Sequence, residues 1–149
     1  MIRAPLIARM NLGVTPMTRI TMPKHMGVHF SSASDNWTTP KETYDALNEE
    51  FQFNDDPCPL GGAGGLDRPW GTSTFVNPPY SEIARWIQKG YEESLLGKTV
   101  VMLIPSRTDT RYWHSYVMKA HEIRFIKGRL KFGGQKNSAP FPSCVVVFR

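Results

Sequence analysis

The sequence has few cysteines, no long apolar run and no acidic residue among its first 34 positions. Its 149 residues include two cysteines, Cys58 and Cys144, too few for a disulfide framework, which favours a reducing compartment. The longest apolar stretches, 100–105 and 145–148, have the length of a strand, whereas a membrane-spanning helix needs roughly 20 apolar residues. No apolar segment typical of a secretory signal is present. We therefore expect a cytoplasmic protein without a membrane span.

Because acidic residues are missing at the start, the charge of the chain is uneven. Residues 1–34 carry four Lys or Arg and no Asp or Glu, a net charge of +4. Residues 35–119 carry eight basic and twelve acidic residues, a net of −4, and residues 120–149 carry six and one, a net of +5. Positive ends suit a phosphate backbone, which binds largely through the release of counterions. The charge favours a nucleic-acid partner, although a solvated surface can have the same composition.

The pattern of apolar residues predicts one α/β domain behind an N-terminal arm. Residues 1–34 have no sustained periodicity, so we expect a basic, flexible arm there and the folded domain over 35–149. Helices are expected to be capped by Thr39, Ser81 and Asp109. Strands are expected over 51–55, 73–77, 99–104, 122–126 and 143–148, with 129–132 pairing with the last. Strands that alternate with helices indicate a mainly parallel sheet.

The candidate catalytic residues follow the strand expected over 73–77, and they are Asn77, Pro78, Pro79 and Tyr80. Ligands of such sheets bind at the carboxyl ends of the strands. The amide oxygen of Asn77 and the carbonyl oxygen of Pro78 can each accept a hydrogen bond from a planar amino group such as adenine N6. That would free the nitrogen lone pair for methyl transfer, and Tyr80 can stack on a base flipped out of a duplex. An ordinary turn at a strand end is the alternative.

Several separated segments resemble the phage-type DNA N6-adenine methyltransferase (Dam) family. The resemblance covers Asp35 to Arg149 and rests on residues 35–40, 56–58, 75–80, 105–110, 128–132 and 139–143. It implies a Rossmann-like fold of the S-adenosylmethionine-dependent methyltransferases. It also implies S-adenosylmethionine as methyl donor, adenine N6 of double-stranded DNA as acceptor, and a bacterial or phage-infected host cell as the setting.

The resemblance also implies where the cofactor would bind. Residues 56–61 would form the cofactor turn, the segment around Thr39 would contact the methionine part, and Asp67 would contact the adenine. The candidate cofactor residues are Trp37, Thr39, Pro40, Asp56, Cys58 and Asp67. Helix caps, turns and core packing are the alternative roles for these residues.

The chain departs from the family pattern because only residues 56–72 separate the first two expected strands. One crossover fits in that length, so the adenosine-binding half looks trimmed, and help from a partner chain or a homo-oligomer stays open. The candidate DNA-binding residues are Arg107, Arg111, Lys127, Arg129, Lys131 and Lys136. We expect no metal, since no cysteine or acidic cluster joins His25 and His29. The alternative functions are methylation of RNA adenine or protein glutamine, and nucleic-acid binding without catalysis.

Overall fold

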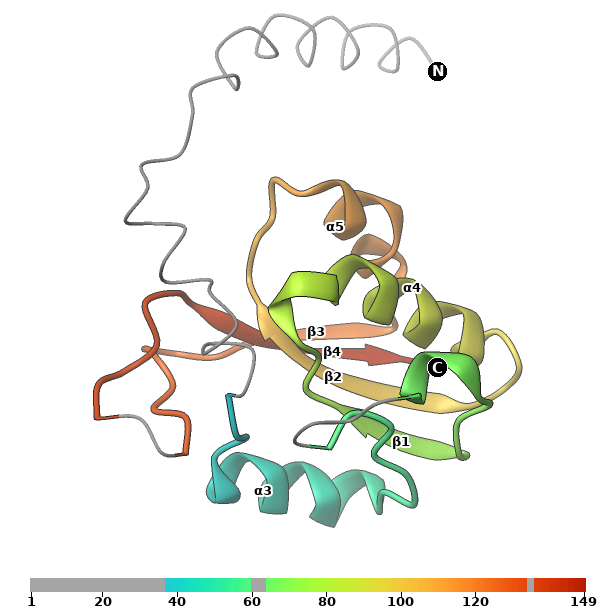
Figure 1. The fold of residues 1–149 in the computed structure, drawn as a ribbon, viewed down its shortest axis with the longest axis horizontal. Coiled ribbons are helices and arrows are strands. Elements are labelled where there is room, and N and C mark those ends of the chain that lie inside the picture. The colour runs from blue at the N-terminus through green and yellow to red at the C-terminus, as the bar shows by residue number, and fades with distance from the viewer. Residues whose placement is uncertain (1–36, 60–63, 134–135) are drawn as a thin grey trace, which may run out of the picture.

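A four-stranded sheet forms the centre of the computed structural model, which describes residues 37–59, 64–133 and 136–149 (Figure 1). The expected N-terminal arm, 1–34, lies outside these residues. The strands, in their order across the sheet, are β1 (Ser73–Val76), β2 (Thr99–Pro105), β4 (Ser143–Phe148) and β3 (Glu122–Phe125). The strands expected over 73–77, 99–104, 122–126 and 143–148 are thus confirmed to within a residue or two.

The α/β class is confirmed, but the expectation of a mainly parallel sheet is wrong. Only β1 and β2 pair in parallel, whereas β4 runs antiparallel to both β2 and β3. The expected pairing of 129–132 with the last strand is also wrong, because Glu122 of β3 stands opposite Val147 there. The loop 126–142 joins β3 to β4, and its described residues, 126–133 and 136–142, contain no helix. Antiparallel neighbours need no such helix, since only a parallel pair requires a long crossover.

The strand expected over 51–55 is reduced to a short pairing beside β1. Phe51, the first residue of that expected strand, is the last residue of the helix α3 (Lys41–Phe51). Asp55 forms an isolated parallel bridge with Thr74. The Asn54 N–H donates to the Ser73 carbonyl at 2.8 Å, and the Phe75 N–H donates to the Asp55 carbonyl at 3.0 Å. The pairing brings the residues after Asp55 to the same edge of the sheet as the end of β1.

Each helix begins two residues after its expected cap, so all three expected caps are wrong by one residue. Pro40, Glu82 and Thr110 occupy the N-cap positions of α3, α4 (Ile83–Ser94) and α5 (Arg111–Ser115). Only Thr110 caps with its side chain, accepting a hydrogen bond from the Trp113 N–H at 3.4 Å. Three short 3-10 turns complete the described elements, at Gly65–Asp67, Tyr80–Glu82 and Val117–Lys119.

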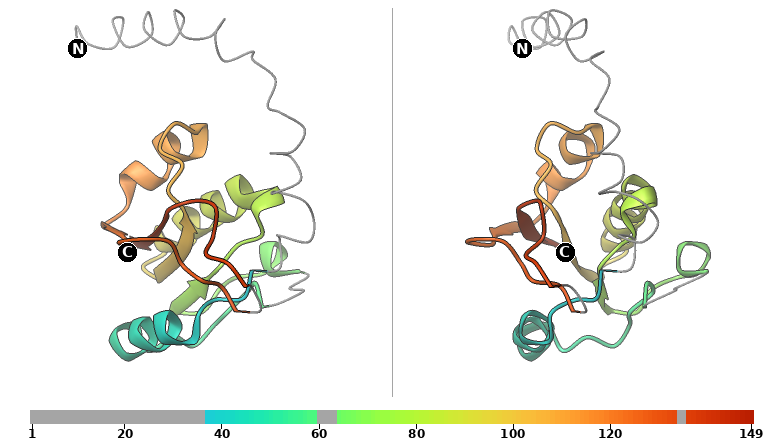
Figure 2. Two further views of the ribbon diagram at one scale, coloured as in Figure 1. Left: turned by 90° about the vertical axis from the view of Figure 1, so that its left-hand side faces the viewer. Right: turned by 60° about the vertical axis from the view of Figure 1, so that its left-hand side comes forward.

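Helices cover both faces of the sheet, with α3 on one side and α4 and α5 on the other (Figures 1 and 2). Successive residues of β2 therefore pack alternately into two cores. Met102 and Ile104 pack with Ile87 of α4, whereas Val101 and Leu103 pack with Leu47 of α3. Burial on both faces explains why β2 is a continuous apolar run in the sequence.

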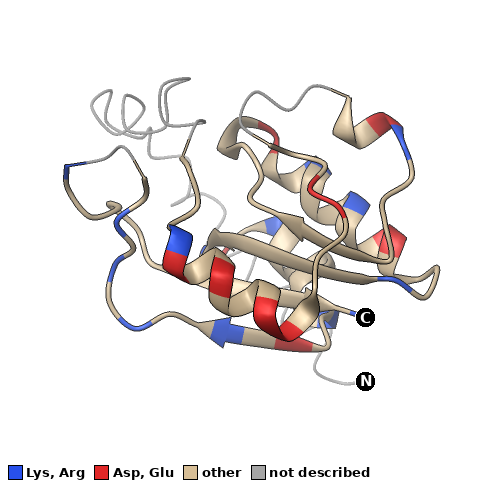
Figure 3. Cartoon of the chain, turned by 90° about the horizontal axis from the view of Figure 1, so that it is seen from below, with Lys and Arg blue, Asp and Glu red and all other residues tan. Residues whose placement is uncertain are grey.

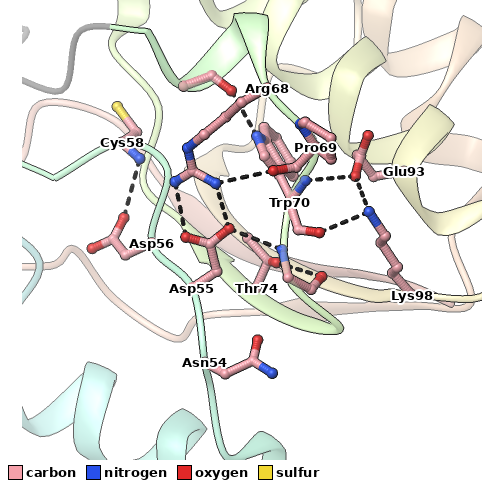
Figure 4. Close-up of polar contacts among 12 residues, drawn as sticks. Asn54, Asp55, Asp56, Cys58, Arg68, Pro69, Trp70, Thr74, Glu93 and Lys98 are labelled. Carbon is pink, nitrogen blue, oxygen red and sulfur yellow. Dashed lines mark hydrogen bonds and ion pairs between the residues drawn. The ribbon is translucent and has the colours of Figure 1, made fainter.

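A buried carboxylate, Glu93 at the end of α4, ties that helix to the chain that leads into β1 (Figure 4). Its Oε1 accepts from the Trp70 N–H at 2.8 Å and from Lys98 Nζ at 2.6 Å, and its Oε2 accepts from Lys89 Nζ at 3.0 Å. Burial alone would raise the pKa of Glu93, but these hydrogen bonds outweigh it and lower the pKa from 4.5 to about 2. The network is therefore charged at neutral pH.

We expect Glu93→Gln to lower the free energy of unfolding by about 2 kcal/mol at neutral pH, because two partly buried ammonium groups lose their counter-charge. A carboxyl whose folded pKa lies below its unfolded value stabilises the fold above the unfolded pKa. The wild type should thus lose this stabilisation as the pH falls from 4.5 to about 2, and the difference from the variant should shrink.

Urea denaturation of both proteins at several pH values measures this difference. The control is Glu92→Gln, which changes the exposed neighbouring acid. Equal stability of Glu93→Gln and wild type at neutral pH would contradict the assignment.

Candidate active site

The amide of Asn77, directly after β1, is held from one side by the segment that precedes α3. Its Nδ2 donates to the Trp37 carbonyl oxygen at 2.6 Å and to Thr39 Oγ1 at 3.0 Å. A carbonyl oxygen can only accept, so the amide atom that faces Trp37 has to be the NH₂ group. Among the described residues, no donor contacts the remaining atom, Asn77 Oδ1. The side chain thus offers its oxygen as an unused acceptor.

A second unused acceptor follows in the chain at Pro78. The Pro79 carbonyl accepts from the Glu82 N–H at 3.3 Å as the turn Tyr80–Glu82 begins. Pro78 itself is buried, and the described ranges contain no donor bonded to its carbonyl oxygen. Two neighbouring residues therefore each keep a neutral oxygen acceptor at the end of β1.

Tyr80 belongs to an aromatic cluster that we define as Trp37, Tyr80, Phe132 and Phe141. Ring centroids lie 5.2 Å apart for Tyr80–Phe141, 5.1 Å for Trp37–Phe132 and 5.6 Å for Trp37–Phe141. Tyr80 is half-buried, whereas Phe132 and Phe141 are buried. Sequence reasoning missed both phenylalanines as site residues, although they lie in two of the segments that carried the family resemblance.

The loop 126–142 reaches this cluster through backbone contacts as well. The Gly133 N–H donates to the Thr38 carbonyl at 2.9 Å, and the Ala139 N–H donates to the Leu130 carbonyl at 2.7 Å. Three parts of the chain that are distant in sequence therefore meet at the carboxyl end of β1: residues 37–40, residues 77–80, and residues 130–133 with 139–141.

A different carboxylate from the expected one is fixed in place beside β1. Arg68 forms a bidentate ion pair with Asp55, with N–O distances of 2.8 and 2.9 Å, and the Gly71 N–H donates to the same carboxylate at 2.9 Å (Figure 4). The hydrogen bond from Arg68 is the main cause that lowers the pKa of Asp55. Sequence reasoning missed this pair, whose residues are separated by the loop 56–67.

The expected cofactor residues Asp56 and Cys58 form a turn of their own. Asp56 Oδ1 accepts from the Cys58 N–H at 3.2 Å, while desolvation by the surrounding chain raises the pKa of the Asp56 carboxyl. Burial raises the pKa of the Cys58 thiol to about 11, so the thiol is protonated and not a nucleophile at neutral pH. In the described chain, no hydrogen bond or ion pair connects this turn with Asn77. Leu60 and Gly61 of the expected cofactor turn lie outside the described residues.

The other expected site residues lie at the surface or at helix starts. Pro40 is the N-cap of α3, and Asp67 is exposed at the end of the turn Gly65–Asp67. Arg111 is exposed at the first position of α5, and Arg107 is half-buried after β2. The loop 126–142 carries four exposed basic residues, Lys127, Arg129, Lys131 and Lys136, whereas acidic residues lie along α3 (Figure 3).

The described residues contain neither a metal-binding cluster nor a membrane-spanning helix. Nowhere in them do three His, Cys, Asp or Glu side chains gather as metal ligands. None of the helices in ranges 37–59, 64–133 and 136–149 has the length and apolar character needed to cross a membrane.

The chain belongs to the DNA N-6-adenine-methyltransferase (Dam) family, whose model matches residues 62–148, more than half of the 149 residues. The match confirms the resemblance seen in the sequence and includes Asn77–Tyr80 and the loop 126–142. The segments 35–40 and 56–58 lie outside the matched range. No curated protein and no solved structure matches the chain.

We expect Gly65→Ala to destabilise the protein by about 2 kcal/mol or more, because a Cβ there would overlap the Pro57 carbonyl oxygen and lie 2.7 Å from the Trp86 ring. Thermal and urea denaturation measure the loss. Gly64→Ala is the control, since nothing lies within 4 Å of its Cβ and only its φ of +84° is unfavourable, at about 1 kcal/mol. Equal stability of the two variants would contradict this close approach.

Proposed function

We propose that this chain transfers a methyl group from S-adenosylmethionine to N6 of adenine in double-stranded DNA, on a Rossmann-like methyltransferase fold. The observation that carries the proposal is the orientation of the Asn77 amide. Its NH₂ group is engaged by Trp37 and Thr39, which leaves Oδ1 as an acceptor without a donor among the described residues. The Pro78 carbonyl is the next acceptor along the chain. Membership of the Dam family supports the same reaction.

The two acceptors suit the chemistry of an exocyclic amino group. The N6 lone pair of adenine is delocalised into the ring, so the nitrogen is a poor nucleophile. Hydrogen bonds from its two N–H groups to Asn77 Oδ1 and to the Pro78 carbonyl would draw the nitrogen toward tetrahedral geometry and localise the lone pair. S-adenosylmethionine supplies an electrophilic methyl group on sulfur. The residues at the site are neutral, so they would act by position and electrostatics and not as a strong base.

The aromatic cluster suits a base that has left its duplex. Tyr80 lies two residues after Pro78, and its ring is packed by Phe141 and Trp37 while part of it stays exposed. Packing of this kind holds an aromatic ring in one orientation, so a flipped adenine could stack on it with little loss of side-chain freedom.

The residues that we propose to hold the cofactor lie in two segments, 37–40 and 56–58, and at Asp67. Thr39 Oγ1 already accepts a hydrogen bond from Asn77, so we do not assign this hydroxyl to the cofactor. Asp56 commits one carboxylate oxygen to the Cys58 N–H, and the second has no partner in the described part of the chain. We propose that Asp56, together with Trp37, Pro40, Cys58 and Asp67, holds S-adenosylmethionine.

The charge distribution favours a nucleic acid over a protein as the acceptor. We propose that the four basic residues of the loop 126–142, together with Arg107 and Arg111, contact phosphates. Four acidic residues are exposed along α3, Glu42, Asp45, Glu49 and Glu50, and we expect that helix to face away from the DNA. Adenine in RNA and the glutamine side chain present the same planar amino group, so both belong in the assay as competing acceptors.

We expect Asn77→Ala to lower kcat for methyl transfer by about 100-fold or more, the effect of removing one well-placed polar group from an active site. Its affinity for S-adenosylmethionine should stay within about twofold of wild type, as measured by calorimetry. Asn137→Ala, an exposed asparagine in the loop 126–142, is the matched control. A kcat of Asn77→Ala equal to that of wild type would contradict the proposed mechanism.

We expect Lys127→Ala and Lys131→Ala each to weaken DNA binding to a similar degree for all DNA sequences. Each should also reduce the slope of the logarithm of the binding constant against the logarithm of salt concentration by about the amount of one phosphate contact. Fluorescence anisotropy of labelled duplexes at several salt concentrations measures both effects. Lys41→Ala, on the acidic helix α3 and paired with Asp45, is the control and should leave both unchanged. If the two loop variants bind like Lys41→Ala, the loop is not the DNA surface.

A further inference from the structure

The single nitrogen of the Asn77 amide uses both of its hydrogens on the segment 37–40. One goes to the Trp37 carbonyl at 2.6 Å and the other to Thr39 Oγ1 at 3.0 Å. Rotating the amide by half a turn would place Oδ1 against the Trp37 carbonyl, so that two acceptors would face each other at hydrogen-bond distance. The segment therefore fixes which side of the amide presents oxygen.

The acceptors themselves lie on well-held backbone. The Thr38 carbonyl between them accepts from the Gly133 N–H at 2.9 Å, and the Pro40 carbonyl accepts from the Tyr44 N–H at 3.0 Å as α3 begins. The Trp37 ring is clamped edge-on against Phe132 and Phe141. Thr39 is free of the helix-cap role, because Pro40 is the N-cap and α3 has no side-chain cap bond. Its hydroxyl is thus committed to Asn77.

We propose that Thr39 is a positioning residue for Asn77 and that the Trp37 carbonyl makes an amide, and not a carboxylate, obligatory at position 77. This inference rests on the proposed function, because it concerns how Asn77 presents Oδ1 to the acceptor nitrogen. It differs from the expectation that Thr39 serves the cofactor. A cofactor contact acts on binding, whereas a positioning contact acts on turnover.

Thr39→Val keeps the shape of the side chain and removes the acceptor for one Asn77 hydrogen. We expect kcat to fall about fivefold to tenfold, the scale of one lost neutral hydrogen bond. The KM and the dissociation constant for S-adenosylmethionine should stay within about twofold. Thr39→Ser, which restores the hydroxyl, should recover most of kcat. A raised dissociation constant with unchanged kcat would instead assign Thr39 to the cofactor and overturn the proposal.

Asn77→Asp tests the part of the proposal that concerns Trp37. An ionised carboxylate cannot donate to the Trp37 carbonyl, whereas a protonated carboxyl can donate one hydrogen there and still offer its other oxygen to the substrate. We expect the ratio of its kcat to that of wild type to rise as the pH is lowered from about 8 to about 5.5, toward the range in which carboxyls protonate. A ratio that does not change with pH, or a fully active variant at about pH 8, would overturn this requirement.

A measurement without turnover separates failure of this inference from failure of the proposed function. The side-chain amide of Asn77 gives a pair of NMR signals that are assigned by their loss in Asn77→Ala. Slow hydrogen exchange of both hydrogens in wild type, and at least about fivefold faster exchange in Thr39→Val, is the expected result. Equal exchange in the two proteins overturns the positioning role. Slow exchange in a wild type that methylates no acceptor would leave the contact standing and remove the proposed function.

Discussion

The hydrogen bond from Asn77 Nδ2 to the Trp37 carbonyl, 2.6 Å long, is the contact on which the candidate site depends. It joins the segment before α3 to the end of β1, and it decides that the amide turns its oxygen away from Trp37. The adjoining contacts hold both sides of this bond, through the aromatic cluster and through the Gly133–Thr38 backbone pairing. An orientation fixed before any ligand binds is what catalysis by positioning needs, since no reorganisation remains for the moment of reaction.

The fold makes this contact possible because the ends of several extended segments lie at the same edge of the sheet. The parallel pairing of β1 with β2, and of Asp55 with Thr74, collects the ends of three extended segments at one edge of the sheet. Two charged networks, Arg68 with Asp55 and Glu93 with Lys89 and Lys98, hold the residues that precede β1, whereas Asn77 follows it. Charged side chains thus stabilise the fold around the site, whereas the candidate catalytic groups are neutral.

Local patterns in the sequence predicted β2 and β4, because continuous apolar runs are typical of strands buried on both faces. The candidate catalytic group, Asn77–Tyr80, could be predicted for a similar reason, since a rare polar motif directly follows an apolar strand. The order of β4 between β2 and β3, the helix caps and the Arg68–Asp55 pair could not. Each of these depends on which distant segments come into contact. Local patterns in a single sequence do not indicate those contacts. The hydroxyl of Thr39 is the clearest case, since the sequence is compatible with a helix cap, a cofactor contact or a hydrogen bond that positions Asn77.

Recovery of methylated nucleosides tests the central claim most directly. The purified chain is incubated with S-adenosylmethionine carrying a labelled methyl group and with unmethylated duplex DNA, RNA or a protein mixture, and the hydrolysed products are separated by mass spectrometry. We predict that the label is recovered in N6-methyladenine from DNA. Label confined to RNA or to glutamine would contradict the choice of acceptor, and a folded chain that labels none of the three would contradict the proposed reaction.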